Sequence, residues 1–233
     1  MVDVESGGGV ARIFLNRPEK VNALSSHVLG ELLAALNGVS KSPDVRAVVL
    51  AGRGKAFCGG ADVQELSSLT ASNAGSFVEK IHAVCEAIRR LPLPVVARLH
   101  GAVIGAGLEI AAACDLRIAA EGTRFSMPEV RLGIPSVVEA ALLPRLMGSG
   151  RAAWLVLTGE PIDARRAYEW GLIEQIGNDD AVQGLIEVLL KNDREALRMQ
   201  KQLLQIWEEA PLAASIEKSV ALFAQSKNRG QSP

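Results

Sequence analysis

Hydrophobic residues follow two alternating patterns over the first half of this chain. Short continuous apolar runs have the character of buried β-strands, and they lie at residues 10–15, 45–50, 95–99 and about 116–119. Apolar residues at every third or fourth position predict helices from Ser25 or Ser26 to about Asn37, and from about Ser76 to Arg90. A further helix is expected just after the third strand. The alternation predicts an α/β fold with a parallel or mostly parallel sheet and crossover helices.

The pattern changes after Gly148, where helical periodicity dominates and little strand is expected. The predicted helices cover residues 151–158, 163–170, 181–191, 194–207 and 212–225. A helical region of this kind commonly covers a site or forms a subunit interface. We therefore expect a core with the active site over residues 1–175, and a helical region over residues 176–233 with a polar tail from about residue 226.

Composition and charge narrow the class of protein. Of the 233 residues, 48% are hydrophobic and 22% are charged, which is ordinary for a globular domain with a sizeable core. Lys plus Arg number 25 against 26 for Asp plus Glu, so the formal net charge is −1. Because nucleic-acid and membrane-surface binders carry a basic excess, neither kind of partner is expected.

Cysteine usage and the N-terminus bear on the compartment. Cys58, Cys85 and Cys114 stand in apolar surroundings and lack the spacing of a zinc site, so we expect buried free thiols in a reducing compartment. The N-terminus lacks the basic and apolar regions of a secretory signal, and no long apolar run predicts a spanning helix. A cytoplasmic protein is therefore expected.

Two glycine-rich loops each precede a predicted helix start. The loop of residues 59–62 ends on Asp62, which is suited to capping a helix, and the loop of residues 105–108 leads into the helix that carries Glu109. Small residues let a ligand approach the backbone, and a helix start leaves N–H groups without partners. Two such loops can aim N–H groups at one oxygen and stabilise an oxyanion or enolate. For either loop alone, a tight strand-to-helix turn is the simpler explanation.

Two glutamates stand in the same segment, among alanine, isoleucine and leucine. Glu109 lies one turn into its helix, and Glu129 follows Pro128, which fixes a bend. Burying a carboxylate among apolar residues disfavours its charged form, and paired carboxylates can divide acid and base roles. The 20-residue separation leaves room for the two to meet across a pocket. Taken singly, a helix-dipole partner at Glu109 and a surface turn residue at Glu129 are equally good explanations.

The remaining polar motifs indicate structural roles. GAVIGAG lacks the spacing of the dinucleotide fingerprint, and no Gly-Lys-Ser/Thr marks a phosphate-binding loop, so hydride transfer and nucleotide hydrolysis are not favoured. The histidines show no metal-like spacing. His27 and His82 fall on helical patterns and are expected to face solvent or cap helices. His100, at a strand end, is expected to make a structural hydrogen bond, and Asp115 and Arg117 an internal ion pair or a turn.

Taken together, these segments resemble the enoyl-CoA hydratase/isomerase (crotonase) family over about residues 8–175. The matching stretches are NRPEKVNAL at residues 16–24, AFCGGAD at 56–62, HG at 100–101 through Glu109 to CD at 114–115, FSMPE at 125–129, LGIP at 132–135, LTGE at 157–160 and AYEWGLI at 167–173. Each motif alone is loose, and the combination is specific.

The resemblance implies a crotonase-like spiral core of ββα turns, with C-terminal helices that form a homotrimer or a dimer of trimers. It implies that the N–H groups of Ala61 and Ala106 form an oxyanion hole for a thioester carbonyl. Glu109 and Glu129 match the two catalytic glutamates that hold and activate one water. Residues expected to bind the acyl-CoA thioester are Lys20, Val21, Ala23, Gly59, Gly60, Asp62, Gly105, Pro128 and Glu139. Coenzyme A is part of the substrate, so no separate cofactor and no metal are expected.

The activity that the resemblance implies is syn addition of water to an α,β-unsaturated acyl-CoA. The presence of both glutamates favours hydration over the family's isomerases, which typically keep only one, near the position of Glu129. An isomerase, a dehydratase acting on an acyl thioester and a non-catalytic acyl-CoA-binding homologue remain as alternatives.

The chain departs from the family pattern at three places. Ala106 stands where members often carry glycine. The sequence SVVEAA at residues 136–141 replaces a glycine-rich stretch, adding bulk and a third carboxylate, Glu139, near the expected acyl pocket. This change leaves the acyl specificity open, and the substrate can carry a short, branched or polar acyl group. The C-terminal region is short for the family, so the oligomer interface and the cover over CoA can differ.

Overall fold

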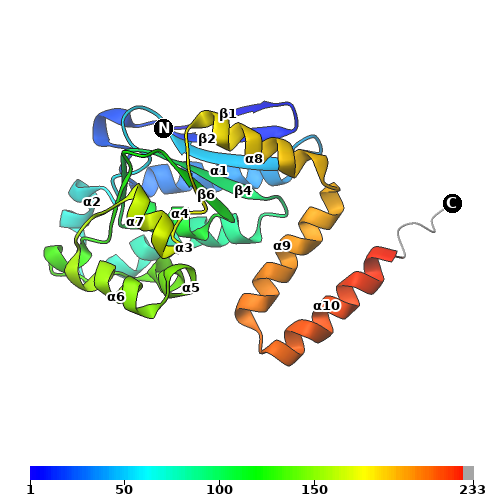
Figure 1. The fold of residues 1–233 in the computed structure, drawn as a ribbon. Helices are drawn as coiled ribbons and strands as arrows, with labels where there is room; N and C mark the ends of the chain where they lie inside the picture. Colours follow the sequence, from blue (N-terminus) through cyan, green and yellow to red (C-terminus); the bar gives the residue numbers. More distant parts are fainter. Residues whose placement is uncertain (228–233) are drawn as a thin grey trace.

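The computed structural model describes residues 1–227, and a six-stranded sheet forms its centre (Figure 1). In spatial order the sheet contains β1 (Val2–Gly7), β2 (Val10–Leu15), β3 (Ala47–Gly52), β4 (Val95–Leu99), β6 (Leu116–Ala119) and β9 (Gln175–Ile176). Only β1, the edge strand, runs antiparallel to its neighbour. The prediction of a mostly parallel sheet is confirmed, and the four predicted strands are present.

A second, smaller sheet was not predicted. It joins β5 (Ala102–Ile104), β7 (Arg124–Ser126) and β8 (Ile162–Asp163), with β5 parallel to β7. Isolated bridges link Cys58 to Val103 and Leu24 to Ala61, so the loop after β3 is held beside β5. Strands of two or three residues are too short to produce a recognisable period, which explains why the sequence pattern missed them.

Helices cover both faces of the large sheet. On one face lie α1 (Ser26–Ser40), which begins after the side-chain cap of Ser25, and α3 (Ala74–Arg90). On the other face α8 (Asp179–Lys191) packs Val182 and Ile186 against sheet residues that include Val49 and Val96. Both predicted N-terminal helices are confirmed, and each extends two or three residues beyond its expected bounds.

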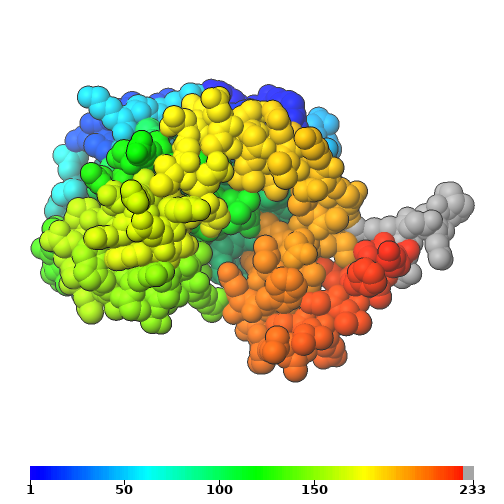
Figure 2. Space-filling view, in the orientation of Figure 1, coloured from blue at the N-terminus to red at the C-terminus, as the bar shows by residue number. Residues whose placement is uncertain are grey.

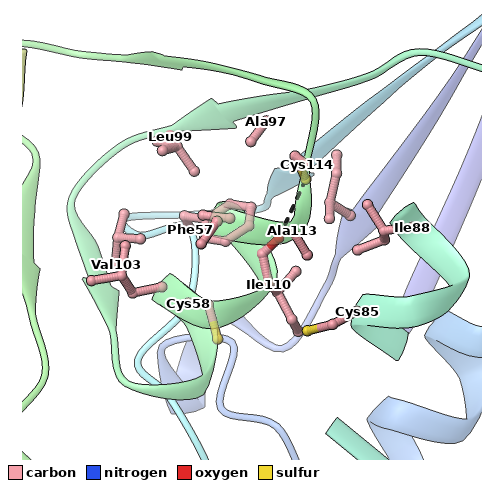
Figure 3. Packing of buried hydrophobic residues seen from close by; sticks show 14 of the residues in the cluster. Phe57, Cys58, Cys85, Ile88, Ala97, Leu99, Val103, Ile110, Ala113 and Cys114 are labelled. Carbon is pink, nitrogen blue, oxygen red and sulfur yellow. Dashed lines mark hydrogen bonds between the residues drawn. The ribbon is translucent and has the colours of Figure 1, made fainter. Parts of the chain in front are cut away.

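The helix α4 (Ala106–Ala113) lies in the middle of the core, and all of its residues are buried. A β-carbon on Gly107 would come within 2.7 Å of Cys58, so the backbone of α4 packs directly on the loop after β3. Figure 3 shows Cys58, Cys85 and Cys114 around this helix. All three thiols are free and buried, as expected from the sequence.

The C-terminal part is helical, as predicted. It contains α5 (Leu143–Met147), α6 (Ser149–Thr158), α7 (Ala164–Trp170), α8, α9 (Arg194–Glu209) and α10 (Leu212–Lys227). Lys201 anchors α9 to the core, because its buried ammonium donates to Ile88 O, Leu93 O and the Asp115 carboxylate. Figures 1 and 2 show α9 leading away from the core and α10 turning back alongside α9.

Within residues 1–227, no helix is both long enough and apolar enough to cross a lipid bilayer. The polar tail predicted from about residue 226 falls mostly on residues 228–233, which lie outside the described residues.

Candidate active site

A cavity of about 240 Å³ brings together segments that are far apart in the sequence. The predicted site residues that line it are Gly59, Gly60, Ala61, Gly105, Ala106, Glu109, Pro128 and Glu129. Most of the remaining wall is apolar and includes Phe77 and Ile81 of α3. The site therefore has a few polar groups in an apolar setting, which is the usual composition of a small-molecule pocket.

The first polar group is the backbone N–H of Ala61. Leu24 pairs with this loop through the flanking residues, since Leu24 N–H donates to Gly60 O and Asp62 N–H donates to Leu24 O. This pairing does not use the N–H of Ala61 itself. Among the described residues, no backbone carbonyl accepts a hydrogen bond from it.

The second polar group is the backbone N–H of Ala106, the first residue of α4. An N–H at this position has no acceptor within its own helix. The two loops lie close together, because a β-carbon on Gly60 would be 3.0 Å from Ile104 O and 4.0 Å from Ala106 N. Gly60 also has a φ of +95°, so glycine is required there for both space and conformation.

Polar side chains behind the first loop fix its shape. Asn22 is buried with φ +55°, accepts the Arg17 N–H and donates to Arg53 O and Ala56 O. The Asp62 carboxylate caps α2 (Val63–Ser68) and lies 2.5 Å from the Arg17 guanidinium, which lowers the Asp62 pKa. Asp62 was expected to bind substrate, yet it does not line the cavity and its carboxylate is used by the scaffold.

The segment of residues 20–23 lies next to the cavity without lining it. Lys20 ends the turn η1 (Pro18–Lys20), and Val21 is exposed and accepts the Gly59 N–H on its carbonyl. Ala23 is half-buried. These three residues flank the loop that carries Ala61, so contact with an extended part of a ligand remains a prediction.

Glu109 is the most buried acid of the cavity, with 4% of its surface exposed. Its Oε1 accepts the backbone N–H of Ala140 at 3.2 Å. Burial raises the pKa of Glu109 to about 8, and the neighbouring charges of Glu129 and Glu139 act in the same direction. Glu109 therefore holds a proton at neutral pH in the free protein.

Glu129 faces the same cavity from the turn η2 (Glu129–Leu132), directly after Pro128. Its Oε2 accepts the Ser136 hydroxyl at 3.0 Å. Its Oε1 lies against Gly105, where a β-carbon would clash with it. The φ of Gly105 is +52°, so this glycine both turns the chain and makes room for the carboxylate. The prediction that the two glutamates meet at one pocket is confirmed by their shared position on the cavity wall.

Glu139 lies elsewhere than expected. It was predicted to contact the acyl group, but it does not line the cavity. It is buried, and its Oε1 lies 2.7 Å from Nδ1 of His82 on α3. Neither residue carries a local sequence signal for this contact, because they are 57 positions apart.

The other polar residues have the structural roles that the sequence indicated. His100 Nε2 lies 3.0 Å from Gly54 O. Asp115 pairs with Lys201, and Arg117 with Glu174. In the part of the chain that the structure describes, no three histidine, cysteine or carboxylate side chains come together as metal ligands.

The arrangement defines a class of site. Two backbone N–H groups without backbone acceptors lie on adjacent loops, and the side chains of Glu109 and Glu129 line the same cavity. Such a site can stabilise negative charge on a carbonyl oxygen while protons are exchanged at neighbouring carbons.

Comparison with known proteins identifies the family. The sequence profile of the enoyl-CoA hydratase/isomerase family matches residues 5–232. The chain is 37% identical over 211 residues to a putative enoyl-CoA hydratase of Thermus thermophilus, an alignment that covers 88% of this chain and 83% of that protein. It is 38% identical over 174 residues to a probable enoyl-CoA hydratase of Bacillus subtilis, covering 74% of this chain and 67% of the relative. The chain belongs to the enoyl-CoA hydratase/isomerase family.

Solved structures agree with this assignment. The enoyl-CoA hydratase of Mycobacterium smegmatis superimposes with a TM-score of 0.93 at 30% identity, over 97% of this chain and 90% of that one. The enoyl-CoA hydratase of Thermoplasma volcanium gives 0.92 at 31% identity, over 96% and 91%. The predicted crotonase-like α/β fold is confirmed.

Proposed function

We propose that this protein is an enoyl-CoA hydratase that adds water to the double bond of an α,β-unsaturated acyl-CoA. The observation that carries the proposal is the placement of both glutamates and both free N–H groups around one apolar cavity. The hydratase names of its relatives support the same activity.

The two N–H groups have the role of charge stabilisers. The thioester oxygen lies between the N–H groups of Ala61 and Ala106, and it receives negative charge when a water oxygen attacks Cβ. Each such donor contributes roughly 3 kcal/mol to stabilising the transition state. Because both donors belong to the backbone, their positions depend on the glycine loops and not on side-chain rotamers.

The glutamates have the role of proton carriers for one water. At neutral pH the pair holds one proton, favoured on the more deeply buried Glu109. The ionised carboxylate takes a proton from the attacking water, and the protonated one supplies a proton to Cα. Because the two carboxylates face one cavity, the hydroxyl group and the proton are added to the same side of the double bond.

Product analysis tests this reaction against the alternatives. The purified protein is incubated separately with crotonyl-CoA, a 3-enoyl-CoA and a 3-hydroxyacyl-CoA, and the products are identified by chromatography and mass spectrometry. We expect crotonyl-CoA to become 3-hydroxybutyryl-CoA, with the reverse reaction from the hydroxyacyl thioester. Migration of the double bond in the 3-enoyl-CoA without hydration of crotonyl-CoA would support an isomerase. Binding of all three without any product would support an acyl-CoA-binding protein.

We also propose that the protein assembles as a homotrimer or dimer of trimers through its C-terminal helices. One face of α10 is apolar and exposed, and it consists of Leu212, Ile216, Val220 and Phe223. Light scattering tests this proposal on the double variant Ile216→Glu with Val220→Glu, for which we expect a smaller particle. Lys218→Glu on the same helix is the control, and an unchanged mass in the double variant would contradict the proposal.

A further inference from the structure

Glu139 is a buried carboxylate that the proposed reaction does not use. It belongs to the turn η3 (Val138–Leu142), and only 5% of its surface is exposed. Its Oε1 lies 2.7 Å from Nδ1 of His82, whose side chain is 53% exposed. Within residues 1–227, its Oε2 is buried and has no hydrogen-bond partner. An incompletely paired buried carboxylate destabilises a fold, so its position calls for a functional reason.

The backbone around Glu139 is strained. Val138 has a φ of +41°, a conformation that β-branched residues rarely adopt. Such strain costs on the order of 1–3 kcal/mol and persists only where the surrounding structure enforces it. Next to Val138, the side chain of Glu139 is buried, and the N–H of the following residue, Ala140, donates to Glu109.

The turn η3 thus connects Glu139 to the catalytic centre in two ways. One is the hydrogen bond from Ala140 to Glu109, which by itself lowers the pKa of Glu109. The other is electrostatic, because the Glu139 charge opposes ionisation of Glu109 and adds to the effects of burial and of Glu129.

The surroundings hold few other charges that bear on the two carboxylates. From α3 the facing groups are His82 and the Cys85 thiol, whose pKa is raised by burial and by the charges of Glu139 and Glu109, so that it stays neutral. Arg145 of α5, which also packs on η3, pairs with Glu208. His82 contacts Glu139 Oε1 from the surface, while the neutral Cys85 thiol interacts with the same carboxylate from inside the core.

We propose that Glu139 and His82 form a positioning pair that keeps the shared proton of the catalytic carboxylates on Glu109. The inference deepens the proposed hydratase function and rests on it. Glu139 does this by its negative charge, which acts against the Ala140 N–H, a donor that favours the ionised form of Glu109. His82, at the surface, anchors the Glu139 carboxylate and sets how much of its charge reaches Glu109.

The sign of the effect follows from the charges. Since the Glu139 carboxylate disfavours a second negative charge nearby, Glu139→Gln lowers the pKa of Glu109. The active form carries one proton on the pair, so the rate falls when that proton is lost at high pH. We expect this descending limb of kcat/KM to move to lower pH by about one unit in Glu139→Gln.

The test compares pH profiles of hydration for matched variants. At pH values above the descending limb, the kcat/KM of Glu139→Gln is expected to be about tenfold lower than that of the wild type. Near pH 6 the two values are expected to agree within about twofold. Glu139→Asp retains the charge and is expected to restore the wild-type limb. Glu79→Gln removes an exposed carboxylate of α3 and is expected to leave the profile unchanged. A Glu139→Gln limb that overlays the wild type would overturn the proposal.

A second comparison uses only the exposed member of the pair. His82→Lys places a permanent positive charge beside Glu139, and His82→Gln places none. The descending limb is expected at lower pH in His82→Lys than in His82→Gln, whatever the charge of the native histidine. Coincident limbs would overturn the proposal even if the Glu139 variants failed to fold. Absence of crotonyl-CoA hydration by the wild type would instead reject the hydratase function itself.

Discussion

The two walls of the cavity are built differently. One wall consists of backbone N–H groups, those of Ala61 and Ala106, held by glycines that let two loops pack closely. The other consists of the Glu109 and Glu129 carboxylates, each held by one hydrogen bond from the segment of residues 136–140. The amide wall is held by backbone pairing between loops and strands, whereas the carboxylate wall depends on hydrogen bonds from the segment of residues 136–140.

The difference has consequences for pH and for stability. Backbone amides carry no titratable proton, so the amide wall works at any pH at which the protein is folded. The carboxylate wall holds a buried acid with a pKa of about 8, so both its activity and its contribution to stability change with pH.

Loss of either carboxylate is expected to have the largest effect. Glu109→Gln or Glu129→Gln retains the shape and a hydrogen-bond acceptor but cannot exchange a proton, so kcat for crotonyl-CoA hydration should fall by about 10³–10⁴-fold. Steady-state kinetics measure this, with circular dichroism as the control for folding. Undiminished turnover in either variant would contradict the assignment of the pair.

Removal of one backbone N–H donor is expected to have the second-largest effect on the rate. Ala106→Pro deletes one N–H at the first position of α4, where proline is compatible with a helix, and kcat should fall by about 10²–10³-fold. Ala106→Gly keeps the donor and serves as the matched control, with activity near the wild type. Equal activities in the two variants would show that the Ala106 N–H does not act on the substrate.

Gly105 lies where the two walls meet, and its substitution should give an intermediate effect. A β-carbon at Gly105 strains a backbone with φ +52° and meets the Glu129 carboxylate, so Gly105→Ala displaces that group. We expect kcat to fall by about 10–100-fold, as for a small misplacement of a catalytic group. Gly30→Ala, in open space on α1, should retain full activity. A fully active Gly105→Ala would contradict the proposed position of Glu129.

The last effect is on stability rather than on rate, and it distinguishes the two walls because it depends on pH. The pKa of Glu109 rises from an ordinary 4.5 to about 8 on folding, so the folded state binds the proton more tightly. Stability that is present below pH 4.5 is lost as the pH rises through about 8. Glu109→Gln lacks this loss and should exceed the wild type by roughly 5 kcal/mol at pH 9 and match it at pH 4. Urea unfolding at the two pH values measures the difference, and Ala106→Gly should show none.

The sequence predicts parts of both walls, for physical reasons. Glycine loops, the capping of α2 by Asp62 and the buried strand at residues 95–99 are local patterns, and the structure has all three. Glu109 and Glu129 are also recognisable, because carboxylates among apolar residues are unusual.

Other features depend on tertiary contacts that no local pattern reveals. The strands β5 and β7 gain their stability from pairing with each other and with the loop after β3, not from periodicity of their own. Glu139 was expected at the acyl pocket, but the positive φ of Val138 turns its side chain toward His82. Asp62 carries a capping signal in the sequence, and in the structure its carboxylate caps α2 and pairs with Arg17.

The central claim is that both walls act on one thioester, and the carbonyl stretch of bound crotonyl-CoA tests it most directly. Glu109→Gln turns over slowly enough for difference infrared spectroscopy of the complex. The account predicts a carbonyl band at lower frequency than in water for Glu109→Gln, and loss of that shift when Ala106→Pro is added. A band that is the same in both variants, or equal to that of free crotonyl-CoA, would contradict it.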